Sequence, residues 1–74
     1  MTNKQTLRTY RISDDTGIST VDATDANDAA RIYAARELIV GVEGADDLRD
    51  AVANAGGYGH MEGPDGEWIW SVSR

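Results

Sequence analysis

The first regular pattern along the chain is an alternation of bulky and polar residues over positions 7–13. Alternate positions, among them Tyr10 and Ile12, fall on one side of an extended chain, which is typical of a β-strand with one buried face. A second stretch rich in β-branched residues covers positions 18–23. Between them, positions 13–17 contain the aspartates and the glycine of a tight turn. We therefore expect the two strands to form a hairpin.

A helix-start signal follows the second strand. Asp25 stands three residues before Asp28, as in the capping arrangements that satisfy the free N–H groups of a first helical turn. Positions 29–38 are rich in alanine and have a helical period, so they predict a helix with two apolar faces. One face, expected to pack on the sheet, consists of Ala26, Ala29, Ala30, Tyr33 and Ala34. The other, on roughly the opposite side, consists of Ile32, Ala35 and Ile39.

A second helix is predicted over positions 45–55, after a break marked by Gly41 and Gly44. Its apolar stripe consists of Ala45, Leu48, Ala51, Val52 and Ala55. This stripe could cover the second apolar face of the first helix. The pair Gly56-Gly57 is typical of a helix end.

The last part of the chain predicts another hairpin. Positions 58–63 and 67–73 form its strands, and Pro64-Asp65-Gly66 has the residues of a turn. Strict alternation puts Trp68, Trp70 and Val72 on one face. We expect both tryptophans to lie in the hydrophobic core, with a protein interface as the alternative.

These elements predict one small α+β domain spanning residues 1–74. The order is ββααββ, with a four-stranded, mostly antiparallel sheet and one longer and one shorter helix packed on one face. The pattern leaves the order of the strands within the sheet open.

The net charge of the chain limits the classes of partner that it is expected to bind. There are 13 acidic residues against 7 lysines and arginines, a formal net charge of −6. This balance argues against direct binding to nucleic acid or to an anionic membrane, since phosphate contacts need cations. It suits a protein partner with a basic surface. Alternatively, the acidity serves only solubility, or reflects a salt-adapted host.

Other features of the composition favour the cytoplasm. The chain has no cysteine, so it has neither a disulfide nor a thiolate zinc site. Positions 1–7 are polar and lack the apolar run of a signal peptide, and no stretch reaches the roughly 20 apolar residues of a membrane span. We expect a cytoplasmic protein without membrane contact.

Candidate chemistry is sparse. His60 is the single histidine, and Glu62 can share its strand face; an enzyme or small-ligand carrier would depend on this histidine. No cysteine, second histidine or G-x-S-x-G motif accompanies it. The segment around Asp25 and Asp28 lacks the spacing of a calcium loop, and helix capping accounts for both residues. We therefore expect no enzymatic activity, no catalytic residue, no metal and no cofactor.

The acidic side chains are the candidate partner-binding residues. They are Glu43, Asp46, Asp47, Asp50, Asp14, Asp15, Glu62, Asp65 and Glu67. Carboxylates spaced along a rigid surface can imitate a row of phosphates and occupy a nucleic-acid-binding groove on a partner. The alternative is that they are ordinary solvated positions on loops and on a helix face.

Two features together resemble the layout of short proteins from phages and other mobile elements. The first is the run from Val21 to Ala26, which leads into an alanine-rich helix, and the second is a hairpin closed by Asp65-Gly66-Glu67-Trp68. In kind, the chain is similar to anti-CRISPR proteins, which are small, acidic and non-enzymatic and block nuclease complexes. The resemblance implies a role but assigns no residue.

Two hypotheses follow. The first is an inhibitor or adaptor that binds a basic protein surface, with Asp46, Asp47 and Asp50 as the main contacts. In its sharper form, it occupies the nucleic-acid channel of a bacterial defence complex. The second is a homo-oligomeric structural or regulatory module, such as a homodimer, in which another subunit covers Ile32, Ala35 and Ile39.

Overall fold

The computed structural model describes residues 6–73, so most of the polar N-terminal segment considered above lies outside it. The strands are β1 (Arg8–Asp14), β2 (Gly17–Ala23), β3 (Gly59–Glu62) and β4 (Trp68–Val72). The helices are α1 (Ala26–Arg36) and α2 (Ala45–Asn54). The predicted order ββααββ is confirmed.

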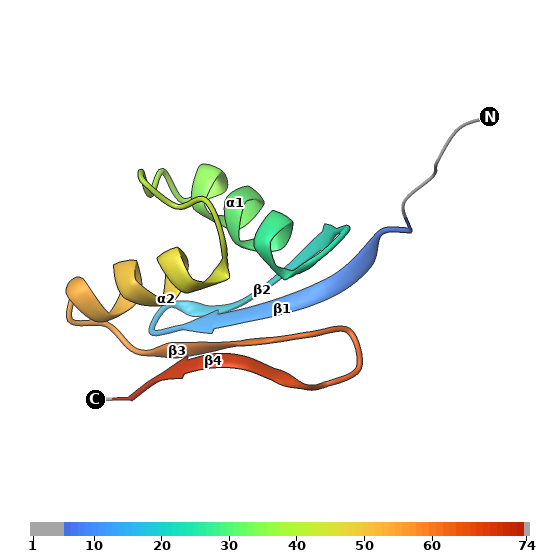
Figure 1. Cartoon of the computed structure of the whole chain (residues 1–74). Coiled ribbons are helices and arrows are strands. Elements are labelled where there is room, and N and C mark those ends of the chain that lie inside the picture. Colours follow the sequence, from blue (N-terminus) through green and yellow to red (C-terminus); the bar gives the residue numbers. More distant parts are fainter. Residues whose placement is uncertain (1–5, 74) are drawn as a thin grey trace.

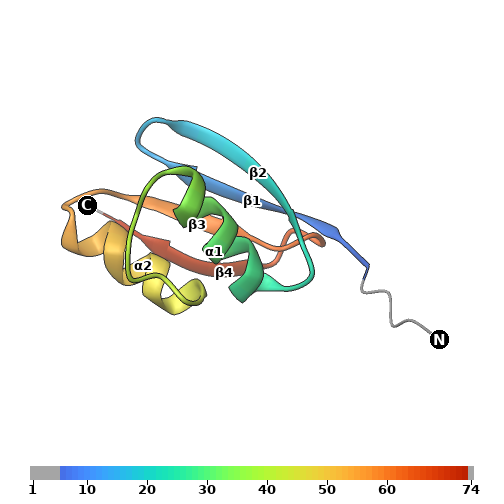
Figure 2. The same cartoon turned by 90° about the horizontal axis from the view of Figure 1, so that it is seen from above.

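The strands form one antiparallel sheet in the order β2-β1-β3-β4. Both helices lie on the same face of this sheet, and the other face has no helical cover within residues 6–73 (Figure 1). Helix α1 packs over β2, and α2 packs over β4 (Figure 2). The predicted two-layer α+β architecture is therefore confirmed, and the structure supplies the strand order that the sequence left open.

The β1–β2 hairpin is regular. Its register runs without a slip from Arg8 opposite Ala23 to Asp14 opposite Gly17. Tyr10 is buried on the helix-facing side, as the alternation predicts. Because every residue of both strands has a partner, side chains alternate cleanly between the two faces of the sheet.

Helix α1 begins as predicted and ends early. The Asp25 side chain accepts a hydrogen bond from the Asp28 N–H at 2.7 Å and forms the N-cap. The helix ends at Arg36 rather than at the predicted position 38, because Leu38 adopts a left-handed conformation with φ 60°. The Ile39 N–H then returns to the Ala34 carbonyl at 2.8 Å, which closes the helix end. Glycine usually occupies such a position, since a side chain there costs about 1–2 kcal/mol.

The two apolar faces of α1 have different environments. Ala29, Ala30, Tyr33 and Ala34 are buried against the sheet, as predicted. On the second face, Ile32 and Ile39 are partly buried against the core, whereas Ala35 is exposed. Other residues of the same chain therefore cover most of the second face.

Helix α2 is held by a hydrogen bond at its first residue and becomes less buried toward its last residue. The Asn27 side chain of α1 accepts a hydrogen bond from the Ala45 N–H at 3.0 Å, which fixes the start of α2 beside α1. Ala45 and Leu48 are buried, Val52 is half-buried and Ala55 is exposed. The predicted apolar stripe therefore packs fully only in its first half. Gly56 ends the helix in the left-handed region, as predicted.

The β3–β4 hairpin contains a β-bulge. Met61 pairs with Trp70 and Glu62 pairs with Trp68, so Ile69 has no partner opposite it. The extra residue places the two tryptophans on opposite faces: Trp70 is 6% exposed in the core and Trp68 is 63% exposed on the uncovered face. The prediction that both tryptophans share a buried face is wrong for Trp68.

The core lies between the sheet and the two helices. Its most deeply buried large side chains are Ile12, Val21, Leu48 and Met61. The Trp70 indole joins this core, and its Nε1 has no hydrogen-bond partner among the described residues. Within residues 6–73, neither helix has the length and apolar character needed to cross a membrane.

Candidate functional site

The structure distributes the candidate acidic residues over three places. Asp14 and Asp15 lie at the β1–β2 turn; Glu43, Asp46, Asp47 and Asp50 lie on α2 and just before it; Glu62, Asp65 and Glu67 lie on the β3–β4 hairpin. The two turns are at opposite ends of the sheet (Figure 1), because β1 and β3 run antiparallel. The candidate residues therefore do not form one continuous patch.

The largest group is the α2 acidic surface, which we define as Glu43, Asp46, Asp47 and Asp50. All four residues are exposed. Asp47 accepts a hydrogen bond from the Glu43 N–H at 3.0 Å, and Asp50 forms an ion pair with Arg49 at 3.0 Å. The Asp46 side chain has neither a hydrogen bond nor an ion pair within residues 6–73. Asp46 and Asp47 also stand in the first helical turn, where negative charge is favourable.

At the β1–β2 turn, Asp14 is occupied by internal contacts. One carboxylate oxygen accepts hydrogen bonds from the Thr16 N–H at 2.8 Å, the Thr16 hydroxyl at 2.6 Å and the Gly17 N–H at 3.1 Å. The other accepts a hydrogen bond from the Tyr33 hydroxyl of α1. Asp14 therefore links the turn to the helix layer, and we assign it a structural role. Its neighbour Asp15 is exposed.

This contact shifts the pKa values of both partners. Burial alone would raise the pKa of Asp14, but the hydrogen bonds from Thr16, Tyr33 and Gly17 outweigh it and hold the pKa below its usual value. Burial raises the pKa of Tyr33, and the hydrogen bond to the Asp14 carboxylate raises it further. The Asp14 carboxylate therefore stays ionised, and the Tyr33 phenol stays protonated, across the physiological pH range.

The three carboxylates of the β3–β4 hairpin also have internal partners. Asp65 forms an ion pair with Arg8 at 3.4 Å, and Glu67 accepts a hydrogen bond from the Asp65 N–H at 3.2 Å. Glu62 lies 2.8 Å from His60 Nε2 and 3.7 Å from Arg11. These pairs partly neutralise the hairpin, whereas Asp46 of the α2 acidic surface and Asp15 of the β1–β2 turn have no ion pair within residues 6–73.

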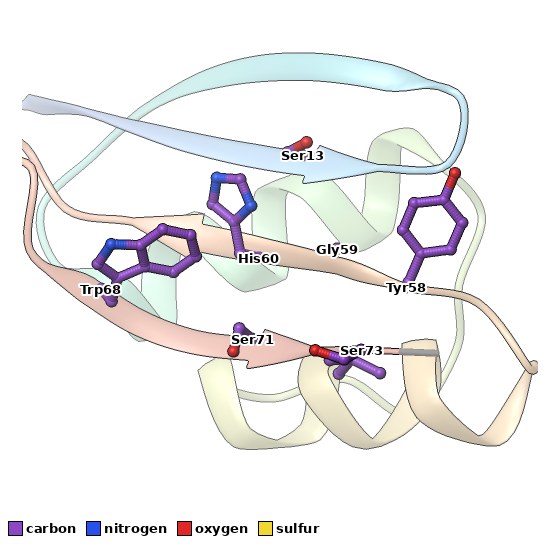
Figure 3. A pocket seen from close by; sticks show the side chains of 8 residues that line it. Ser13, Tyr58, Gly59, His60, Trp68, Ser71 and Ser73 are labelled. Carbon is purple, nitrogen blue, oxygen red and sulfur yellow. The ribbon is translucent and has the colours of Figure 1, made fainter.

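The uncovered face of the sheet carries an aromatic and polar cluster. The His60 and Trp68 rings lie with their centroids 4.2 Å apart and their planes tilted by 46°. Ser13 of β1 and Ser71 of β4 stand directly opposite His60 in the sheet register. An open pocket of about 530 Å³ runs over this region, with Tyr58 at one end (Figure 3).

The chemistry of this cluster is limited. Glu62 can orient the His60 imidazole, as in acid–base catalysis. A nucleophile would need a hydrogen bond to the same ring, and the neighbouring Ser13 hydroxyl makes none within residues 6–73. The interactions that His60 makes here are its ring contact with Trp68 and its hydrogen bond with Glu62.

Several residues that shape these surfaces were missed by sequence reasoning. Trp68 was assigned to the core because nothing in the sequence marks Ile69 as a bulge. The pairing of Tyr33 with Asp14 joins positions 19 residues apart and also has no sequence signal. The pairing of His60 with Glu62 was signalled by their i, i+2 spacing on one strand.

Comparison of the chain with models of known protein families, with curated proteins and with solved structures found no significant match. The resemblance to phage-encoded inhibitors therefore stays a prediction, as does the expected lack of enzymatic activity.

Proposed function

We propose that this chain is a non-enzymatic protein-binding domain that recognises a partner with a basic surface through the α2 acidic surface. One observation carries this proposal: four exposed carboxylates lie close together, and two arginines contact this group, Arg49 through Asp50 and Arg31 through the Glu43 carbonyl. Such an excess of one charge steers a complementary partner and favours the correct orientation on encounter. A cytoplasmic location belongs to the proposal, since the chain has no cysteine.

In its sharper form, the proposed domain is an inhibitor that imitates nucleic acid. Asp46 and Asp50 are one helical turn apart, a rise of about 6 Å, so both carboxylates lie on the same side of α2. Carboxylates at this spacing could occupy phosphate sites on a nucleic-acid-binding complex, such as a bacterial defence nuclease. This form agrees with the anti-CRISPR-like character of the sequence.

The test is capture of a partner from bacterial lysate, with washes at rising salt, using the wild-type chain and an Asp46→Lys/Asp50→Lys variant. We expect the wild type to retain a nucleic-acid-binding complex at low salt and release it at high salt. The variant should retain none, although its circular dichroism spectrum is unchanged. Asp47 is left intact because its carboxylate also holds the Glu43 N–H.

A control places a single charge reversal elsewhere, which is half of the charge change in the double variant. Asp22→Lys places a lysine on the uncovered face of β2, away from the helices. This variant should bind like the wild type. Equal binding by the α2 variant and the wild type would remove the α2 acidic surface from the proposal.

A second candidate is a homo-oligomeric module, and the uncovered sheet face favours it. Trp68 and Ile18 both lie on this face and are 63% and 67% exposed. Exposed apolar side chains on one surface commonly mark an interface. Light scattering after size exclusion tests this candidate: a dimeric mass that becomes monomeric in Trp68→Ala supports it, and a monomeric wild type at high micromolar concentration rejects it.

A further inference from the structure

A second, smaller pocket lies between the β1–β2 turn and the C-terminal half of α2. Its volume is about 280 Å³, and its apolar floor includes Ile39, Val52 and Ala55. These are the last positions of the α2 stripe and the end of the α1 seam, which the core leaves partly uncovered. The pocket is thus a consequence of the way α2 loosens toward its C-terminus.

The rim of this pocket is negative. Asp14 and Asp15 line one side, and Asp15 is exposed without a hydrogen bond within residues 6–73. The other side is the C-terminal end of α2, whose last turn has no basic residue to offset the negative end of the helix dipole. No lysine or arginine lines the pocket. Tyr58 adds an aromatic ring to the wall.

We propose that this pocket receives one arginine or lysine side chain from the basic partner, so the inference rests on the function proposed above. The aliphatic stem lies on the floor formed by Ile39 and Val52, and the cationic group lies at the Asp15 carboxylate. The Tyr58 ring offers a further attraction to the cation. The volume is slightly below the range of about 300–1,000 Å³ found for small-ligand pockets, which suits a single side chain.

The charges of the pocket explain why the occupant must be cationic. The hydrogen bonds to Asp14 hold its pKa below the usual value, so this carboxylate remains ionised at neutral pH. An uncharged apolar side chain could pack on the apolar floor but would leave the Asp15 carboxylate without a counter-ion. A guanidinium or ammonium group on a long stem satisfies both parts of the pocket.

The test is an NMR titration of the full chain with N-acetyl-arginine methylamide. The uncharged citrulline and norleucine analogues are the matched probes. We expect the arginine probe to shift the amide signals of Asp15 and Gly57 with millimolar affinity. Both uncharged probes should bind more weakly, by up to about five-fold, since an exposed ion pair contributes at most about 1 kcal/mol. Equal shifts with citrulline, or no shift at these amides, would overturn the proposal.

Two variants separate the pocket from the rest of the surface. Asp15→Asn should weaken binding of the arginine probe about five-fold. Ala55→Leu should abolish this binding, because the larger side chain fills the pocket. Ala55 has right-handed helical backbone angles, which leucine adopts readily. Asp22→Asn, on the uncovered face of β2, is the control and should leave it unchanged. Unaltered binding by either pocket variant would contradict the assignment.

A hexa-arginine peptide distinguishes failure of the pocket from failure of the proposed function. Shifts at both Gly57 and the α2 acidic surface support both proposals. Binding that shifts only residues 43–50 overturns the pocket and leaves the function in place. No binding by this peptide at low salt overturns both.

Discussion

The two hairpins of the sheet differ in regularity and in what they present to solvent. The β1–β2 hairpin pairs every residue, and its turn is held to α1 by the contact between Asp14 and Tyr33. The β3–β4 hairpin is interrupted by the bulge at Ile69, and its turn is held to the rest of the sheet by an exposed ion pair. The first hairpin is therefore a scaffold, and the second displays a large aromatic side chain.

The bulge shows how one residue can separate two side chains that look equivalent in the sequence. Trp68 and Trp70 are two positions apart, a spacing that puts both on one face of a regular strand. The extra residue between them sends Trp70 into the core and Trp68 to the uncovered face. Bulges often re-aim side chains near functional sites, which agrees with an interaction role for that face.

The largest expected effect is a difference in stability between the alanine variants of Trp70 and Trp68. Trp70→Ala should lower the free energy of unfolding by about 3–5 kcal/mol, because it leaves a cavity under α2. Trp68→Ala should lower it by less than about 1 kcal/mol, because that side chain is mostly in solvent. Urea denaturation followed by circular dichroism measures both values.

A milder substitution is the control for Trp70. Trp70→Phe retains much of the buried area and removes the indole N–H that has no partner within residues 6–73, so it should cost less than Trp70→Ala. Similar losses for the alanine variants at positions 68 and 70 would mean that the two side chains do not lie on different faces.

The next effect concerns the link between the β1–β2 turn and α1. Tyr33→Phe and Asp14→Asn should each destabilise the fold by about 1–3 kcal/mol. Tyr33→Phe removes the donor to one Asp14 oxygen, and Asp14→Asn replaces one of the two acceptor oxygens by an NH2 donor. In a double-mutant cycle the two changes should couple by at least about 0.5 kcal/mol. Additive losses would show that the hydrogen bond between the two side chains contributes nothing.

The same link predicts limits on stability at both ends of the pH range. The pKa of Asp14 is lowered by folding, so its contribution is present above the unfolded value of about 4 and is lost as the pH falls below it. The pKa of Tyr33 is raised by folding, so its contribution is present below about pH 10 and is lost as the pH rises through the folded value. Urea midpoints should therefore be highest between about pH 5 and pH 9.

Single substitutions show which residue causes the loss of stability at each end of the pH range. In Tyr33→Phe the alkaline decline should flatten, and in Asp14→Asn the acid decline should become shallower. An unchanged alkaline limb in Tyr33→Phe would assign the decline to another group.

The fold could be predicted wherever a local signal agreed with the final structure. The Asp25 N-cap, the alanine face of α1 and the alternation in β1 depend on residues close in sequence, and all three are confirmed. The order of the strands could not be predicted, because it depends on contacts between distant segments. The early end of α1 also has no signal, since Leu38 adopts a conformation that usually needs glycine.

The candidate site was predictable only as a set of charged positions. The sequence marks acidic residues as exposed, but it does not show which of them have partners. Asp14 pairs with Tyr33, Asp65 with Arg8 and Glu62 with Arg11, all through long-range contacts. The structure therefore favours α2 because it has the largest group of exposed carboxylates, whereas Asp65 and Glu62 form ion pairs with arginines.

The smallest expected effect is at the β3–β4 turn. Asp65→Asn should change the free energy of unfolding by less than about 0.5 kcal/mol, because both partners of its ion pair with Arg8 are well exposed and the charges are screened by solvent. The same change of carboxylate to amide at Asp14 should cost several times more, since that group is partly enclosed and accepts four hydrogen bonds. Comparing the two variants in one urea series isolates the contribution of the internal contacts from that of the charge. Equal losses at the two turns would mean that the β3–β4 turn is held as firmly as the β1–β2 turn, and the division into a scaffold hairpin and a display hairpin would no longer hold.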